Sequence, residues 1–331
     1  MLRRDLLLAM GGLVLGCRRA SEPEASDDSP SPIAIQENDA LGSLGAVPVE
    51  LWPAFDVSVH RPAPARLPSD GEPPQTYADF LAEQPARPSQ HNRTLAILPI
   101  GEYPRGFVVE YERTHLVRSP EPALLGRFCE AWFGLPVRIL PALNDARLER
   151  MASRERDGRR QLDAQALLVW LNTMLPRDCF CMLALTLEDL YQAGAAHVFG
   201  LASLHTRVAV HSTLRYDPGF ENADARPPEF EHTILRRALR VVVHETAHMF
   251  GLRHCVHFAC VMNPTAGVAD LDALPLDPCP VCLRKLWHAT GVPLQPRWQA
   301  LAELARTLEL EELGWYCERL AAMSLPRRAK L

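Results

Sequence analysis

The feature that most constrains this chain is a group of three histidines within residues 244–254, which read HETAHMFGLRH. His244 and His248 are four positions apart, so on a helix their imidazoles lie one above the other on the same face. Two imidazoles placed in this way can bind one metal ion. Apolar residues recur at helical spacing from 231 to 252, which predicts one long helix that carries this pair. The other side of this helix is expected to face the core, through Leu239, Val242, Val243, Thr246, Met249 and Phe250.

The residues beside the two histidines indicate a catalytic metal site. Glu245 lies about 100° further round the helix, where its carboxylate can activate a water on the metal. Gly251 can adopt the left-handed conformation that ends a helix and reverses the chain. That reversal would bring His254 to the metal as a third ligand. Three protein ligands and an open position are typical of catalytic zinc, so the sequence predicts a hydrolytic zinc site.

Four of the nine cysteines form two closely spaced pairs. Cys255 and Cys260 follow the third histidine, and Cys279 and Cys282 have the C-x2-C spacing that lets two thiolates converge on one ion. We therefore expect a second, structural zinc with four thiolate ligands. The alternative is two disulfides, which an exported protein would permit. Four further cysteines are predicted to be buried thiols: Cys129, Cys179, Cys181 and Cys317.

The combined string HExxHxxGxxHC resembles the archaemetzincins, a branch of the metzincin metallopeptidases. The resemblance continues through residues 254–262 and through CPVCLRKL at residues 279–286. Upstream, residues 181–191 and 198–204 are also similar to the family. The resemblance covers residues 77–292 and leaves out the N-terminal leader and the C-terminal end.

The resemblance implies a zinc metallopeptidase and a role for each residue of the motif. His244, His248 and His254 would hold the catalytic zinc, and Glu245 would be the general base. Met262 would lie in the turn beneath the metal as a packing support and not as a ligand. A peptide substrate would bind in extended form along an edge strand made of Val198, Phe199, Gly200, Leu201, Ala202, Ser203 and Leu204.

Two other functions are compatible with the residues. The same zinc chemistry would serve an amidase that acts on a non-peptide amide, such as a cell-wall bond. Alternatively, both zincs could be structural in a non-catalytic, extracytoplasmic binding module, although Glu245 would have no purpose there. The expected partner is a peptide or protein substrate, and the chain is expected to be a monomer. A net charge of −5 and a pI near 6.2 argue against a general nucleic-acid binder.

Residues 1–17 have the pattern of an export signal. A basic start with Arg3 and Arg4 precedes an apolar stretch at residues 6–16 that is too short to span a membrane. The stretch ends in a glycine and Cys17, which resembles a bacterial lipobox, so Cys17 is expected to carry lipid. The alternatives are an ordinary signal peptide and, from the paired arginines, a twin-arginine export signal. We therefore expect an exported protein that is periplasmic or anchored to a membrane only through this lipid.

Composition divides the rest of the chain. Residues 18–46 are rich in Ser, Pro, Asp and Glu and are expected to be a disordered tether. Residues 47–92 form a Pro-rich extension that is expected to pack on the domain, with a latency segment over a cleft as the alternative. Residues 93–292 are the predicted catalytic domain, and residues 293–331 are a predicted helical extension. The Pro-rich extension contains apolar anchors: Leu51, Trp52, Phe55, Tyr77, Phe80 and Leu81.

The order of elements predicts the fold class. Buried strands are expected at residues 94–100 and 181–187, a further strand at residues 137–140, and a hairpin at residues 197–203 and 207–212. Helices are expected from the cap Ser119 to residue 133, before Gly134, and at residues 161–174, 282–289, 298–310 and 311–323. This order indicates an α+β fold. It combines a small mixed β-sheet with helices, an active-site helix that binds zinc, and a short, mainly helical C-terminal subdomain.

Overall fold

The structure is a computed structural model that describes residues 38–323 apart from 66, 68–70, 104–107 and 112–114. The predicted signal peptide, Cys17 and most of the predicted tether lie outside the described residues. Within the described part of the chain, no helix has the length and apolar character needed to cross a membrane.

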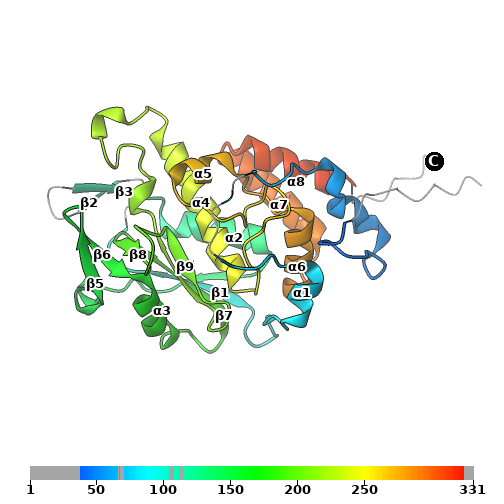
Figure 1. Ribbon diagram of the computed structural model, residues 1–331, viewed down its shortest axis with the longest axis horizontal. Coiled ribbons are helices and arrows are strands. Elements are labelled where there is room, and N and C mark those ends of the chain that lie inside the picture. The colour runs from blue at the N-terminus through cyan, green and yellow to red at the C-terminus, as the bar shows by residue number, and fades with distance from the viewer. Residues whose placement is uncertain (1–37, 66, 68–70, 104–107, 112–114, 324–331) are drawn as a thin grey trace, which may run out of the picture. The chain divides into compact units, whose positions relative to one another are not determined.

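The centre of the fold is a five-stranded mixed sheet (Figure 1). Its strands lie in the order β4 (Val137–Ile139), β1 (Thr94–Pro99), β7 (Cys179–Thr186), β10 (Val208–Ser212) and β9 (Gly200–Ala202). The first four strands are parallel, and β9 runs antiparallel to β10 at one edge. The three predicted strands and the hairpin are confirmed, although β9 is shorter than expected and β4, at the other edge, is only partly buried. Every residue of β7 is buried, as is usual for a parallel strand with both faces covered.

Helices cover both faces of this sheet (Figure 1). Helix α2 (Pro122–Phe133) and helix α4 (Phe230–His248) share one apolar core with Ile97 of β1. Helix α3 (Ala164–Asn172) packs in a second core with Leu98, the next residue of the same strand. Successive side chains of a strand point to opposite faces, so one strand contributes to both cores. The predicted fold class, a small mixed sheet with helices, is confirmed.

Two helices begin later than the sequence predicted. Helix α2 starts at Pro122 and not after Ser119, because a residue that precedes a proline disfavours the helical conformation, and Glu121 is extended with a ψ of 146°. The helix ends before Gly134 as predicted, and this glycine has a left-handed φ of 65°. Helix α3 starts after Asp163 and not at residue 161, because the Asp163 carboxylate accepts hydrogen bonds from two N–H groups of the first turn.

Two small sheets outside the central one are absent from the sequence prediction. The first contains β5 (Ser153–Arg156), β6 (Arg159–Asp163) and β8 (Asp189–Tyr191), and the second pairs β2 (Val108–Tyr111) with β3 (His115–Arg118). Strands β5 and β6 are antiparallel, and β8 is parallel to β6. Most residues of β5 and β6 are polar, so no alternation of apolar residues marks them as strands.

The C-terminal region is helical, as predicted. It contains α5 (Val268–Ala273), α6 (Pro280–Thr290), α7 (Leu294–Thr307) and α8 (Glu311–Met323). Trp298 of α7 is completely buried in the core that α2 and α4 share. The C-terminal helices therefore pack into the main core. Shorter 3₁₀ helices elsewhere span Val49–Phe55, Val57–Val59, Asp145–Arg150, Leu214–Tyr216 and Ala223–Ala225.

The described N-terminal residues are packed on the domain. Leu41 and Leu44 are completely buried, and Arg284 of α6 donates hydrogen bonds to the main-chain oxygens of residues 41–43. The expected tether boundary is therefore wrong for residues 38–46, because these leucines join the core and the main chain is bound by an arginine.

The Pro-rich extension follows and includes helix α1 (Tyr77–Ala82). Its apolar anchors differ in burial. Leu81 is 39% exposed and is not an anchor, contrary to expectation. The anchors that are buried or packed against the core are Leu51, Trp52, Phe55, Tyr77 and Phe80.

Replacing Leu44 with alanine is expected to lower the free energy of unfolding by about 2–5 kcal/mol, because it leaves a cavity in a packed core. Chemical denaturation measures this change. Val49, which is 56% exposed, provides the control, and Val49→Ala is expected to change stability by less than about 0.5 kcal/mol. Equal stabilities of the two variants would show that residues 38–46 are not part of the folded domain.

Candidate metal centre and active site

Helix α4 carries the first two histidines and the glutamate of the motif. It ends at His248, earlier than the predicted end at residue 252, because the following N–H groups bond to closer carbonyls in a tighter final turn. Gly251 then adopts a left-handed φ of 86°, as predicted from its residue type, and reverses the chain. The reversal brings the His254 ring back beside the end of the helix.

The three histidine side chains converge on one point. The Nε2 atoms of His244 and His248 are 3.1 Å apart. The centroid of the His254 ring lies 5.2 Å and 4.9 Å from the centroids of these two rings. One ligand nitrogen from each residue lies within 4.8 Å of the others. The structure therefore brings together the three histidines that the sequence singled out, in a group that could hold a metal ion.

Hydrogen bonds to the main chain fix two of the rings. The Nδ1 atom of His244 is 2.9 Å from the oxygen of Val261, and that of His248 is 2.6 Å from the oxygen of Leu252. A carbonyl oxygen can only accept, so each Nδ1 donates and each Nε2 presents a lone pair. Burial lowers the pKa of His244 well below its ordinary value, which favours the neutral form that binds metals. This donor set fits zinc, for which neutral imidazoles are common ligands.

The Glu245 carboxylate is buried beside the histidines. Burial raises its pKa to about 8, and positive charge at His254 and Arg240 acts in the opposite direction. A metal ion at the histidines would add a larger positive charge and favour the ionised carboxylate. Gly200 of β9 approaches so closely that an added Cβ would lie 2.7 Å from the Glu245 Oε1 atom. The glycine therefore leaves the space that this carboxylate occupies.

A cavity of about 710 Å³ lies in front of the histidines and Glu245. One wall is the β9 edge of the central sheet. The strand spans only Gly200–Ala202, and Val198 forms a bridge to Leu190. Ser203, which was predicted in the substrate edge, is outside the cavity lining. The predicted edge residues that line the cavity are Val198, Phe199, Gly200, Leu201, Ala202 and Leu204.

Two charged residues at the cavity were not assigned a role from the sequence. Arg240, one helical turn before His244, is buried and donates to the main-chain oxygen of Asn263 at 3.1 Å. Burial lowers the pKa of Arg240 to about 10. Glu72, from the N-terminal extension, also lines the cavity. Arg240 could have been found from the sequence, because its four-residue spacing from His244 places both on the same face of the helix. No local pattern marks Glu72.

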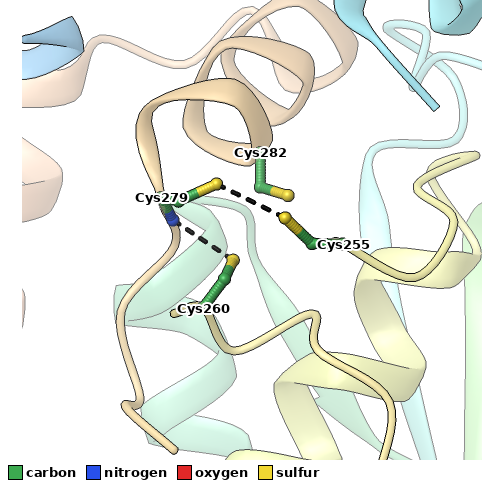
Figure 2. Close-up of side chains that lie close together, drawn as sticks. All are labelled: Cys255, Cys260, Cys279 and Cys282. Carbon is green, nitrogen blue, oxygen red and sulfur yellow. Dashed lines mark hydrogen bonds between the residues drawn. The ribbon is translucent and has the colours of Figure 1, made fainter. Parts of the chain in front are cut away.

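Figure 2 shows Cys255, Cys260, Cys279 and Cys282 with their side chains gathered at one place. The four sulfurs lie within 4.8 Å of one another, and those of Cys255 and Cys279 are 3.7 Å apart. An S–S bond is about 2.05 Å long, and these four cysteines are not paired as disulfides. The structure therefore favours the predicted tetrathiolate site over the alternative of two disulfides. The other four cysteines that the structure describes are buried, as expected: Cys129, Cys179, Cys181 and Cys317.

Asn263 holds the loop that carries the first cysteine pair. It is completely buried, and its Oδ1 accepts a hydrogen bond from the N–H of Cys260 at 2.7 Å. Its Nδ2 donates to the oxygens of Cys255 and Phe258 at 2.7 Å and 2.9 Å. The preceding residue, Met262, is also completely buried, and its oxygen accepts from the N–H of Cys255 at 2.8 Å. One amide side chain thus replaces the hydrogen bonds that regular secondary structure would supply.

Comparison with known proteins tests the family that the motif suggested. Residues 138–288 match the family model described as Peptidase family M54. Archaemetzincin-2 of Rattus norvegicus is 30% identical over 260 residues, which cover 71% of this chain and 70% of the relative. The chain belongs to the archaemetzincin family. Archaemetzincin-2 of Homo sapiens is 28% identical over 305 residues, which cover 82% of each chain.

Membership of the archaemetzincin family confirms the resemblance seen in the sequence and identifies a zinc metallopeptidase. It favours peptide hydrolysis over the non-catalytic binding module. A solved archaemetzincin structure from Archaeoglobus fulgidus has 25% sequence identity and a TM-score of 0.41, and the match covers 58% of this chain and 99% of that one.

Replacing Asn263 with alanine is expected to lower the free energy of unfolding by at least about 2 kcal/mol, because it leaves buried main-chain groups of the cysteine loop without a partner. Denaturant titration measures the loss. The same substitution at Asn172, which is exposed at the end of α3, serves as the control and is expected to cost less than about 0.5 kcal/mol. A wild-type stability for Asn263→Ala would mean that the loop is held by other contacts.

Proposed function

We propose that His244, His248 and His254 hold the catalytic zinc and that Glu245 is the general base for hydrolysis of a peptide bond. The convergence of three imidazoles beside a buried carboxylate, at one cavity, carries this proposal. Zinc bound there would polarise the scissile carbonyl and lower the pKa of a water towards about 7. The Glu245 carboxylate takes a proton from the attacking water and then delivers it to the nitrogen of the leaving amine.

The substrate is proposed to bind as an extended chain along β9. This strand is the edge of the sheet, so its outer N–H and C=O groups can pair with an added peptide strand. Gly200, at the start of β9, lies against the Glu245 side chain. A peptide paired with this edge would therefore pass in front of the general base and the histidines. This position supports an extended peptide or protein segment as the substrate.

The four cysteines are proposed to hold a second, structural zinc, which gives two ions per chain. Four protein ligands leave no open position for a water, so this ion would have no catalytic role. Because Cys255 follows His254 directly, the thiolate site would also restrain the third catalytic ligand. Met262 is proposed to support the centre by packing, since the preceding residue, Val261, accepts the hydrogen bond from His244.

The chain is further proposed to act outside the cytoplasm as a monomer, anchored by lipid on Cys17. The support lies in the sequence, where a basic start and a short apolar stretch precede this cysteine. Contact with a membrane would then be confined to the lipid. Peptide substrates would meet the enzyme after export.

Replacing Glu245 with glutamine is expected to lower kcat/KM at least about 100-fold, because a general base contributes about 10²–10⁴-fold. The zinc-loaded full-length chain is incubated with a diverse peptide library, and new termini are identified by mass spectrometry. Glu130→Gln, at an exposed position of α2, is the matched control and is expected to cleave like wild type. Equal cleavage by Glu245→Gln and wild type would contradict the mechanism. Cleavage of a non-peptide amide, such as one in cell-wall fragments, with no cut in the peptide library, would instead support the amidase.

Gly200→Ala is expected to lower kcat up to about 100-fold without loss of zinc, because the new Cβ would displace the Glu245 carboxylate. Steady-state kinetics and metal analysis of the same sample separate the two effects. Gly267→Ala is the control, since an added Cβ there meets nothing within 4 Å. If kcat of Gly200→Ala matched wild type, the position of Glu245 against β9 would have no catalytic importance.

A further inference from the structure

The N-terminal extension reaches the loop that carries the third histidine. Residues 72–85 contact residues 251–257, although Glu72 and His254 are 182 positions apart in the chain. The sequence left open whether this extension is a structural element or a latency segment over the cleft. The contacts between the two segments address that question.

Gln75 is the main link between the extension and the loop. Its side chain is only 1% exposed, and its Nε2 atom donates to the oxygen of Gly251 at 3.1 Å. Its Oε1 atom accepts from the N–H of Arg253 at 3.1 Å and from Lys285 Nζ at 3.0 Å. A buried amide with all these partners joins three separate segments. Loss of any of them would leave a buried polar group without its hydrogen bond.

The extension also packs closely over the reversal of the chain. A Cβ added to Gly251 would lie 2.8 Å from the Cβ of Pro85, so a larger residue would not fit there without displacing the extension. Arg253 Nη2 forms an ion pair with Glu83 Oε1 at 3.2 Å. The turn that directs His254 towards the other histidines is therefore shaped in part by the extension.

Glu72 contacts the third histidine itself. Its Oε2 atom accepts a hydrogen bond from the main-chain N–H of His254 at 3.1 Å and lies 3.4 Å from the Nδ1 atom of the same residue. Its Oε1 atom is 3.8 Å from Arg253 Nε. One carboxylate is thus placed against both the main chain and the ring of His254.

The three rings differ in what their Nδ1 atoms face. Those of His244 and His248 face main-chain oxygens of Val261 and Leu252, whereas that of His254 faces the Glu72 carboxylate. A histidine that donates its second ring N–H to a carboxylate has its tautomer and orientation fixed and is a better metal ligand. His254 lies in a loop, whereas His244 and His248 lie on helix α4. The orientation of the His254 ring therefore depends more on contacts such as the one with Glu72.

We propose that Glu72 is a positioning residue for the third zinc ligand. Its carboxylate accepts the Nδ1 proton of His254 and so directs Nε2 towards the ion. The extension then completes the active site and is not a segment that must be removed for activity. This inference rests on the proposed function, since it takes His254 as a zinc ligand.

The test compares Glu72→Ala with Asp79→Ala in the full-length chain. Asp79 lies in the same extension, but its carboxylate accepts hydrogen bonds from Thr76 at the start of α1. Zinc affinity is measured by competition with a chelator, and the visible spectrum after cobalt substitution reports the geometry at the histidines. Glu72→Ala is expected to weaken zinc binding at the histidines about 10–100-fold and to change the cobalt spectrum, while the thiolate site keeps its zinc. Glu72→Gln retains an acceptor and is expected to recover part of the affinity, and Asp79→Ala is expected to bind zinc like wild type.

Unchanged zinc affinity in Glu72→Ala, or an equal loss in Asp79→Ala, overturns the proposal. A higher kcat/KM for Glu72→Ala with unchanged zinc affinity also overturns it and identifies the extension as an inhibitory segment. His254→Ala distinguishes this failure from failure of the proposed function. If His254→Ala binds zinc like wild type, the third ligand is wrongly assigned. If His254→Ala weakens binding and Glu72→Ala does not, only the role of Glu72 is wrong.

Discussion

The candidate metal centre depends on two hydrogen bonds from imidazole rings to the main chain. His244 and His248 donate to the oxygens of Val261 and Leu252, so the chain that follows α4 sets the orientation of both rings. The segment after α4 must therefore lie beside the end of the helix at two places. The first is at Leu252, which accepts from His248, and the second is at Val261, which accepts from His244. A change in its path would rotate the rings away from their common point. The left-handed Gly251 makes the first turn of this path, and the three hydrogen bonds of the Asn263 side chain hold the loop that returns to Val261.

The histidine and cysteine groups are parts of one loop system. His254 and Cys255 are adjacent, and the N–H groups of Met262 and Cys279 point to the Cys260 sulfur at 3.4 Å and 3.2 Å. Main-chain groups buried in an irregular loop need such partners, because no helix or sheet supplies them. A neutral thiol is a weak acceptor, whereas the thiolate of a zinc site carries negative charge. Metal at the cysteines would therefore strengthen the loop on which His254 depends, as expected where metal binding and folding are coupled.

Much of the site could be predicted because its signals are local in the sequence. His244, Glu245 and His248 lie within little more than one helical turn, and the apolar runs of β1 and β7 mark buried strands. Glu72 and Gln75 could not be predicted, since their partners are 182 and 210 positions away and no short-range pattern connects them. Strands β5 and β6 were missed for another reason. Their mostly polar sequences lack the apolar alternation that identifies a strand. They form strands because they pair with each other and because β6 pairs with β8.

Gln75 and Lys285 are 210 positions apart, so the contact between them can form only late in synthesis of the chain. Synthesis releases the extension first, and its partners on the loop and on α6 emerge only much later. A nascent or truncated chain that stops before Cys279 would contain the HExxH helix but would lack Cys279, Cys282 and the lysine that binds Gln75. Such a fragment would be missing half of the thiolate site and an anchor of the loop that carries His254. Peptidase activity would therefore begin only when nearly the whole chain is made.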